Sequence, residues 1–160
     1  MLLKNKIIFY IIILGYTLLQ AEWGSITLKE HVDKSTLIVI AEFQKEVEKK
    51  EVEMGTTQLI LFESNETIKG DINGSFFVKG QAFEICMAQK LFTDVPYTKY
   101  LLFLEQEGNT TTYNLVHGER SALEIKNGLL GWIADRKQID RGEEVMTSVE
   151  EVKREIGELR

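Results

Sequence analysis

The residues of this chain that could do chemistry are few and lie far apart in the sequence. They are two histidines, His31 and His117, and a single cysteine, Cys86. Neither histidine has a second ligand at the spacing typical of metal sites, so we interpret both as structural or surface residues. Cys86 has no partner for an internal disulfide. We interpret it as a buried thiol. An intermolecular disulfide is the alternative, and a reactive nucleophile is disfavoured because no neighbouring motif supplies a base.

No glycine-rich phosphate loop, nucleophile elbow or zinc-helix motif occurs in the sequence. Asp and Glu make up 25 of the 160 residues, but their spacing does not single out a pair for acid–base catalysis. We interpret them as a solvated face. The sequence therefore predicts no catalytic, cofactor-binding or metal-binding residue, and no cofactor.

Three Asn-x-Ser/Thr triplets begin at Asn65, Asn73 and Asn109. In a secreted eukaryotic protein they would be acceptors for N-linked glycans. Such triplets also arise by chance, and turns favour asparagine for backbone reasons. We leave glycosylation open and expect none unless the source is a eukaryote.

The first 21 residues have the pattern of a secretory signal peptide. Lys4 and Lys6 precede the apolar run Ile7–Leu19, and Ala21 is a small residue at its exit. The run is shorter than the about 20 apolar residues that span a bilayer, so an uncleaved anchor is the less favoured alternative. We predict cleavage after Ala21 and an exported protein, periplasmic or extracellular, without a stable membrane span.

Removal of residues 1–21 removes two lysines and no acid, which leaves 17 basic against 25 acidic residues and a net charge of −8. Nucleic-acid binding depends on basic residues that neutralise phosphates, and anionic lipid surfaces also repel a negative protein. We therefore predict a protein or small-molecule partner and no nucleic-acid partner.

The elements that would position these residues begin with a capped helix. Thr27 and Glu30 have the spacing of a capping box, which predicts a short helix over Leu28–Lys34. The run Thr36–Ala41 is apolar on both faces, as in the middle of a sheet or a barrel wall. The charged stretch Gln44–Glu53 predicts a solvated strand end and loop.

Further strands are expected between turn residues. They are predicted at Thr56–Thr67, Ser75–Val78, Tyr100–Leu104 and Thr111–Val116, followed by a hairpin at Ala122–Trp132. Asn127-Gly128 is the preferred pair for the type I′ turn of that hairpin. Residues 81–99 are predicted to be irregular, and the charged residues 135–144 predict a linker.

Ser148 and Glu151 form a second capping-box pattern and predict a helix to the C-terminus. Its apolar residues recur at helical spacing: Val149, Val152, Ile156 and Leu159. We expect this stripe to dock on its own domain rather than on a partner.

Together these elements predict a mainly β, α+β fold, in which a small antiparallel barrel carries a short N-terminal helix and a C-terminal helix. The predicted division is a signal peptide at 1–21, a β-barrel-like domain at 22–134, and a charged linker with an amphipathic helix at 135–160.

The order of motifs over about two-thirds of the chain resembles a known family. A capped helix leads into Leu37–Glu42, a later strand ends in the Lys69-Gly70 corner, and Cys86 precedes the strand Tyr100–Leu104. This order resembles exported bacterial proteins that share the barrel of the tissue inhibitors of metalloproteinases and the netrin-like module. The resemblance implies an OB-like barrel, that is, one of the oligonucleotide/oligosaccharide-binding type.

The inhibitory chemistry of that family does not carry over. Its inhibitors chelate the protease zinc through an N-terminal cysteine, whereas the predicted mature N-terminus here is Glu22. The resemblance also implies a disulfide from the position of Cys86 to the strand after Tyr100–Leu104, and residues 114–117 contain no thiol. Only the fold is transferable, and a fold does not specify a function.

We therefore expect an exported, non-enzymatic binding domain. A small secreted hydrolase is the alternative, and it would need acidic residues that converge in a cleft. A metalloprotease-inhibitor-like protein without the N-terminal cysteine is the third hypothesis.

Overall fold

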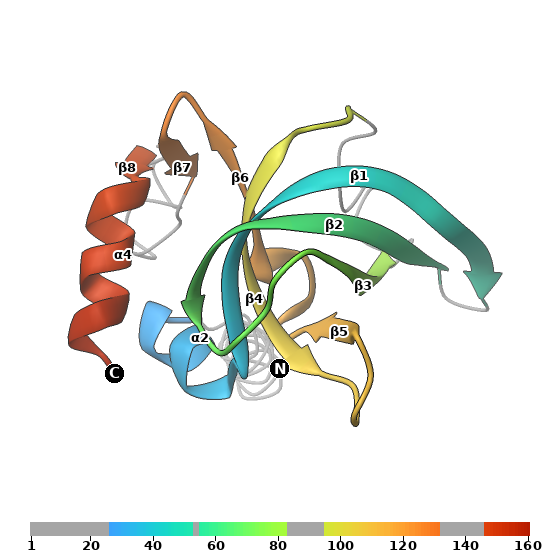
Figure 1. The fold of residues 1–160 in the computed structure, drawn as a ribbon, viewed down its shortest axis with the longest axis horizontal. Helices are drawn as coiled ribbons and strands as arrows, with labels where there is room; N and C mark the ends of the chain where they lie inside the picture. The colour runs from blue at the N-terminus through green and yellow to red at the C-terminus, as the bar shows by residue number, and fades with distance from the viewer. Residues whose placement is uncertain (1–25, 53–54, 83–94, 132–145) are drawn as a thin grey trace, which may run out of the picture.

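The computed structural model describes residues 26–52, 55–82, 95–131 and 146–160. These residues form two α-helices, one 3₁₀-helix and eight strands (Figure 1). The predicted signal peptide, Cys86 and the predicted linker at 135–144 lie outside the described residues. So does most of the stretch 81–99.

The two helices are α2 (Leu28–Lys34) and α4 (Val149–Glu158). At the start of α2, the Thr27 hydroxyl accepts a hydrogen bond from the Glu30 amide, and the Glu30 carboxylate accepts one from the Thr27 amide at 2.7 Å. The Ser148 hydroxyl accepts from the Glu151 amide at the start of α4. Both predicted helices and their N-caps are confirmed.

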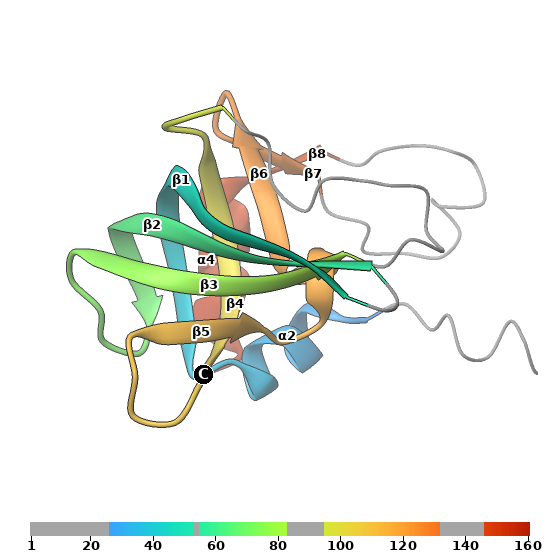
Figure 2. The same cartoon turned by 90° about the vertical axis from the view of Figure 1, so that its right-hand side faces the viewer.

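The strands are β1 (Leu37–Val52), β2 (Gly55–Lys69), β3 (Ser75–Ala82), β4 (Lys99–Gln106), β5 (Thr112–Leu115), β6 (Ala122–Lys126), β7 (Leu129–Gly131) and β8 (Met146–Ser148), with the 3₁₀-helix η1 (Gly118–Ser121) between β5 and β6. Five of them close into a ring in the order β1-β2-β3-β5-β4, and β4 pairs with β1 (Figures 1 and 2). β6, β7 and β8 continue beyond β4 as a small sheet. The prediction of a mainly β, barrel-like fold with two helices is confirmed.

The barrel is not entirely antiparallel. β3 and β5 run parallel over Phe77–Lys79 and Thr112–Asn114, whereas the other four pairings of the ring are antiparallel. The prediction of a wholly antiparallel barrel is therefore wrong at this pair. Alternation of apolar residues reveals which face of a strand is buried, but not the direction of its neighbour.

β1 also extends further than predicted. The charge of Gln44–Glu53 predicts a strand end followed by a loop, but the strand continues to Val52 because β2 pairs with it as far as Gly55. The side chains of residues 45–52 are exposed, as their charge predicted. The long exposed part of β1 and its partner β2 project together from the barrel (Figure 1).

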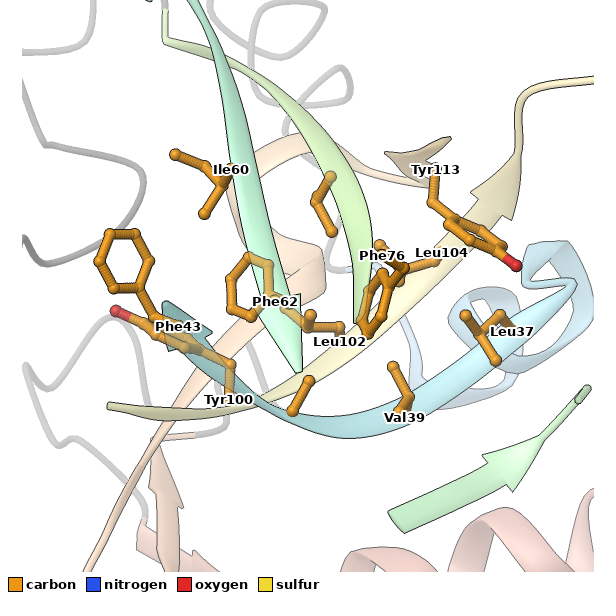
Figure 3. Packing of buried hydrophobic residues seen from close by; sticks show 12 residues of the cluster. Leu37, Val39, Phe43, Ile60, Phe62, Phe76, Tyr100, Leu102, Leu104 and Tyr113 are labelled. Atoms are coloured by element: carbon orange, nitrogen blue, oxygen red, sulfur yellow. The ribbon is translucent and has the colours of Figure 1, made fainter. Parts of the chain in front are cut away.

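The wall formed by β1 and β4 is buried on both faces, as the apolar run Thr36–Ala41 predicted. One set of alternate residues of this wall belongs to the inner cluster, which fills the barrel (Figure 3). Together with residues of the other strands, the inner cluster consists of Leu37, Val39, Ala41, Phe43, Ile60, Phe62, Phe76, Val78, Tyr100, Leu102, Leu104 and Tyr113. The other set belongs to the outer cluster, which lies between the wall and the helices. Together with residues of α2, α4 and β7, the outer cluster consists of Val32, Ile38, Ile40, Leu101, Phe103, Leu130, Val149, Val152 and Ile156. The expected docking of α4 on its own domain is confirmed.

The Lys69-Gly70 corner joins the barrel to α2. Gly70 has φ +85°, and a Cβ there would lie 2.6 Å from the carbonyl oxygen of Thr36, so the position requires glycine. The Lys69 ammonium donates to the Val32 carbonyl at 2.7 Å. The corner therefore fixes the end of β2 against α2 and the start of β1.

Candidate functional site

The interior of the barrel is occupied by side chains. Phe62 is fully buried, and its ring centroid lies 6.0 Å from those of Phe43 and Phe76 and 5.9 Å from that of Tyr100 (Figure 3). Interiors packed in this way have no room for a ligand. A binding site must therefore be sought on the outside of the barrel.

A groove of about 590 Å³ lies where β1, β2 and β3 approach β5 and η1. We call it the β2–β3–β5 groove, and its lining residues are Glu48, Thr57, Gln58, Leu59, Lys79, Gly80, Asn114, Leu115 and Gly118. Its volume falls in the range of about 300–1,000 Å³ that is typical of ligand sites. No single stretch of sequence marks it, because its lining comes from four strands and a 3₁₀-helix.

The groove offers hydrogen bonds rather than strong charge. Asn114 supplies an amide group and Leu59 an apolar surface. The Thr57 hydroxyl donates to the Lys50 carbonyl at 3.3 Å and the Gln58 amide donates to the Glu46 carboxylate at 2.5 Å, so both side chains offer their oxygens as acceptors. The Lys79 ammonium already contacts the two carboxylate oxygens of Glu107 at 2.6 and 2.8 Å, so its charge is partly neutralised. This lining suits an uncharged polar ligand with some apolar surface.

The described lining of the groove holds one carboxylate group. Glu48 carries it, whereas hydrolysis by paired carboxylates needs two such groups flanking the scissile bond. In the described part of the chain, no group of three or more His, Cys, Asp or Glu residues is placed to hold a metal ion.

The two histidines, which are remote in sequence, lie together beside the groove. Their ring centroids are 4.8 Å apart. His31 is 2% exposed; its Nδ1 lies 3.0 Å from the Thr27 carbonyl oxygen, and its Nε2 lies 3.2 Å from the Arg120 carbonyl oxygen. His31 therefore ties α2 to η1, and His117 directly precedes Gly118 of the groove.

Burial dominates the electrostatics of this pair. It lowers the pKa of His31, although the carbonyl groups of Thr27 and Arg120 oppose the shift. Burial also lowers the pKa of His117, and the neighbouring His31 adds to the effect. Nε2 of His117 is buried without a hydrogen-bond partner within the described ranges. Sequence reasoning missed the pair because no local spacing reports a contact between α2 and the segment before η1.

The three asparagines of the Asn-x-Ser/Thr triplets are all exposed. Asn65 lies in β2, Asn73 in the turn between β2 and β3, and Asn109 in the turn between β4 and β5. No helix among the described residues has the length and apolar character to cross a membrane. No family model and no curated protein matches this chain.

Proposed function

We propose that this chain is an exported, non-enzymatic binding domain with an OB-type barrel, and that its β2–β3–β5 groove binds an extended peptide segment of a partner protein. Export is supported by the apolar run and flanking lysines within residues 1–21. The proposed partner is a protein because the groove combines hydrogen-bonding groups with a small apolar surface.

The OB type is supported by the order of the ring and by its one parallel pair. In the order β1-β2-β3-β5-β4, β1 also pairs with β4, and β3 lies parallel to β5. OB barrels bind their ligands on the face of strands 2 and 3 and on adjacent loops. Leu59 of β2 and Lys79 of β3 are a cross-strand pair, and both line the groove.

The observation that carries the proposal is the composition of the groove. The Asn114 amide and the side-chain oxygens of Thr57 and Gln58 can accept hydrogen bonds from the amides of a peptide backbone, and the exposed Gly118 carries no side chain over the main chain. Among the described residues that line the groove none is aromatic, so this part of the lining offers no platform on which a base would stack. The net charge of −8 for residues 22–160 also disfavours nucleic acid.

The first test maps the partner onto the surface in living cells. The full chain carries a photo-activated cross-linking residue at Thr57 or Asn114, with the exposed Lys29 of α2 as the control position. We expect adducts with one partner segment from the two groove positions and none from Lys29. Equal labelling at all three positions would contradict the proposal.

The second test uses the cross-linked segment, identified by mass spectrometry, as a synthetic peptide. Leu59→Arg should weaken its binding by about tenfold or more. Leu61→Arg is the matched control, because Leu61 lies two residues along the same face of β2, is also half-buried and does not line the groove. Equal affinities of the two variants would overturn the assignment of the groove, and cleavage of the peptide would favour a hydrolase.

A further inference from the structure

All three Asn-x-Ser/Thr triplets have an acidic residue two positions before the asparagine. The segments are Glu63-Ser64-Asn65-Glu66-Thr67, Asp71-Ile72-Asn73-Gly74-Ser75 and Glu107-Gly108-Asn109-Thr110-Thr111. Because 25 of 160 residues are acidic, an acid at this position in all three has a probability of about 0.004. The coincidence therefore calls for a chemical reason.

We propose that Asn65, Asn73 and Asn109 are N-glycosylated by an oligosaccharyltransferase of the bacterial type, whose acceptor is Asp/Glu-x-Asn-x-Ser/Thr. The acidic residue gives the transferase a carboxylate to pair with a basic group. Glycosylation thus does not require a eukaryotic source, contrary to the expectation from the short triplet alone. The proposal rests on export, since such a transferase acts outside the cytoplasm.

The reaction needs a lipid-linked oligosaccharide as the co-reactant. The asparagine Nδ2 attacks C1 of an oligosaccharide carried on a polyprenyl pyrophosphate. The bond from C1 to the pyrophosphate oxygen breaks, the bond from C1 to Nδ2 forms, and one amide proton passes to solvent. The polyprenyl pyrophosphate is the leaving group, and no oxidant or reductant takes part.

Asn109 is the acceptor that the folded barrel presents best, although its acid, Glu107, pairs with Lys79 in an exposed ion pair that solvent weakens. All five residues of its segment are exposed, in the turn between β4 and β5. The Asn109 amide makes no hydrogen bond with the residues that the structure describes, so its Nδ2 is available. Exposed turns are the segments that enzymes reach in folded proteins. We expect the highest occupancy at Asn109.

The segments of Asn65 and Asn73 contact each other across the β2–β3 turn. The Ser75 hydroxyl donates to the Glu63 carboxylate at 2.5 Å, and the Thr67 hydroxyl donates to the Ile72 carbonyl at 3.0 Å. These bonds occupy the hydroxyl groups of Ser75 and Thr67, which each acceptor triplet requires at its third position. Transfer to Asn65 and Asn73 is therefore expected before β2 pairs with β3, during export.

The fold has room for a glycan at Asn65 even though this residue lies in a strand. Its neighbours Ser64 and Glu66 pair with Ala41 and Ile40, which leaves Asn65 as the bulged residue with no partner in β1. The Asn65 side chain is exposed, and its amide donates a hydrogen bond of 3.3 Å to the carboxylate of Glu42. A glycan there would extend into solvent.

The acceptors gather at one end of the barrel. The turns between β2 and β3 and between β4 and β5 lie on the same side of the molecule (Figure 2), and the Phe77 amide donates to the Thr111 carbonyl at 3.0 Å. Asn65 is six residues, or about 20 Å of strand, from Leu59 of the groove. A glycan on Asn65 would therefore leave the groove open.

The test is the mass of the full chain recovered from its own organism, in cytoplasmic and exported fractions. We expect the exported protein to lack residues 1–21 and to carry glycans, with glycopeptides at Asn109 the most abundant. An exported chain of bare polypeptide mass would overturn glycosylation alone. A chain found only in the cytoplasm with residues 1–21 attached would overturn both export and glycosylation.

The variant Glu107→Gln distinguishes the short acceptor Asn-x-Ser/Thr from the longer acceptor Asp/Glu-x-Asn-x-Ser/Thr. It keeps Asn109-Thr110-Thr111 and removes the acidic residue. We expect loss of the glycan at Asn109 only. Glu105→Gln, an exposed glutamate of β4 outside the segment, is the matched control and should keep all glycans. The Lys79–Glu107 pair is exposed and contributes little to folding. An unchanged glycan at Asn109 in Glu107→Gln would overturn the proposal.

Discussion

The inner and outer clusters are built from alternate residues of the same two strands, β1 and β4, but different elements cover them. The inner cluster is enclosed by the five strands of the ring and contains the rings of Phe43, Phe62, Phe76, Tyr100 and Tyr113. The outer cluster is mostly aliphatic and is covered by α2 and α4, which lie far apart in the sequence.

The two clusters contribute to stability in different ways. The inner cluster exists only when the ring is closed, so its packing should be lost in a single cooperative step. The outer cluster depends on two helices that attach to a wall already buried on its other face. Such an attached helix can be released locally while the barrel persists.

The largest effect is expected from Phe62→Ala, which removes the ring at the centre of the inner cluster. The free energy of unfolding should fall by about 3–5 kcal/mol, because a fully buried phenylalanine leaves a cavity when it is truncated. Chemical denaturation would measure the loss. Phe77→Ala is the matched control, since Phe77 is half-buried on the neighbouring strand and lies outside the inner cluster. Equal losses of unfolding free energy in the two variants would contradict the prediction that packing inside the barrel dominates its stability.

A smaller effect is expected from Ile156→Ala in the outer cluster. Ile156 is fully buried, so its truncation should cost about 2–4 kcal/mol. Hydrogen exchange should show faster exchange in α4 with the amides of β2 still protected. Leu159→Ala, at a residue of the same stripe that is 38% exposed, should change little. Uniform loss of protection over α4 and the barrel would show that the two clusters unfold as one unit.

The smallest effect is expected from pH at the border of the outer cluster. Burial lowers the pKa of both His31 and His117, so the unfolded chain takes up protons at a higher pH than the folded chain. Stability is therefore full above the ordinary histidine pKa of about 6.5 and falls as the pH drops below it, by at most about 1.4 kcal/mol per pH unit for each imidazole.

The measurement is the free energy of unfolding of the wild type and of His31→Gln at a series of pH values. The variant should show a shallower loss below neutral pH, because one of the two titrating groups is gone. Stability that rises on acidification in the wild type would contradict the assigned direction. His117→Gln should reduce the slope in the same way.

Local chemistry set the parts of this fold that the sequence predicted correctly. The Thr27 and Ser148 hydroxyls cap their helices through amides three residues away. Asn127 and Gly128 both adopt positive φ, +54° and +76°, as the predicted type I′ turn requires. The apolar residues on both faces of β1 and β4 predicted a wall with both faces buried.

The sequence predicted no site residue, and the groove and the histidine pair emerged only from the folded chain. Leu59 and Asn114 come together because the ring closes through β3 and β5, and the direction of that pair leaves no mark on residue alternation. His31 meets His117 because η1 folds back against α2.

The caps, turns, strand faces and acidic acceptor segments can therefore be predicted from the sequence, since each depends on residues within a few positions of one another. The parallel pair, the full length of β1, the groove and the contact between the histidines become visible only in the folded structure. These features depend on pairing between segments distant in the chain, whose free energy comes from burial and hydrogen bonds that exist only once the barrel has closed.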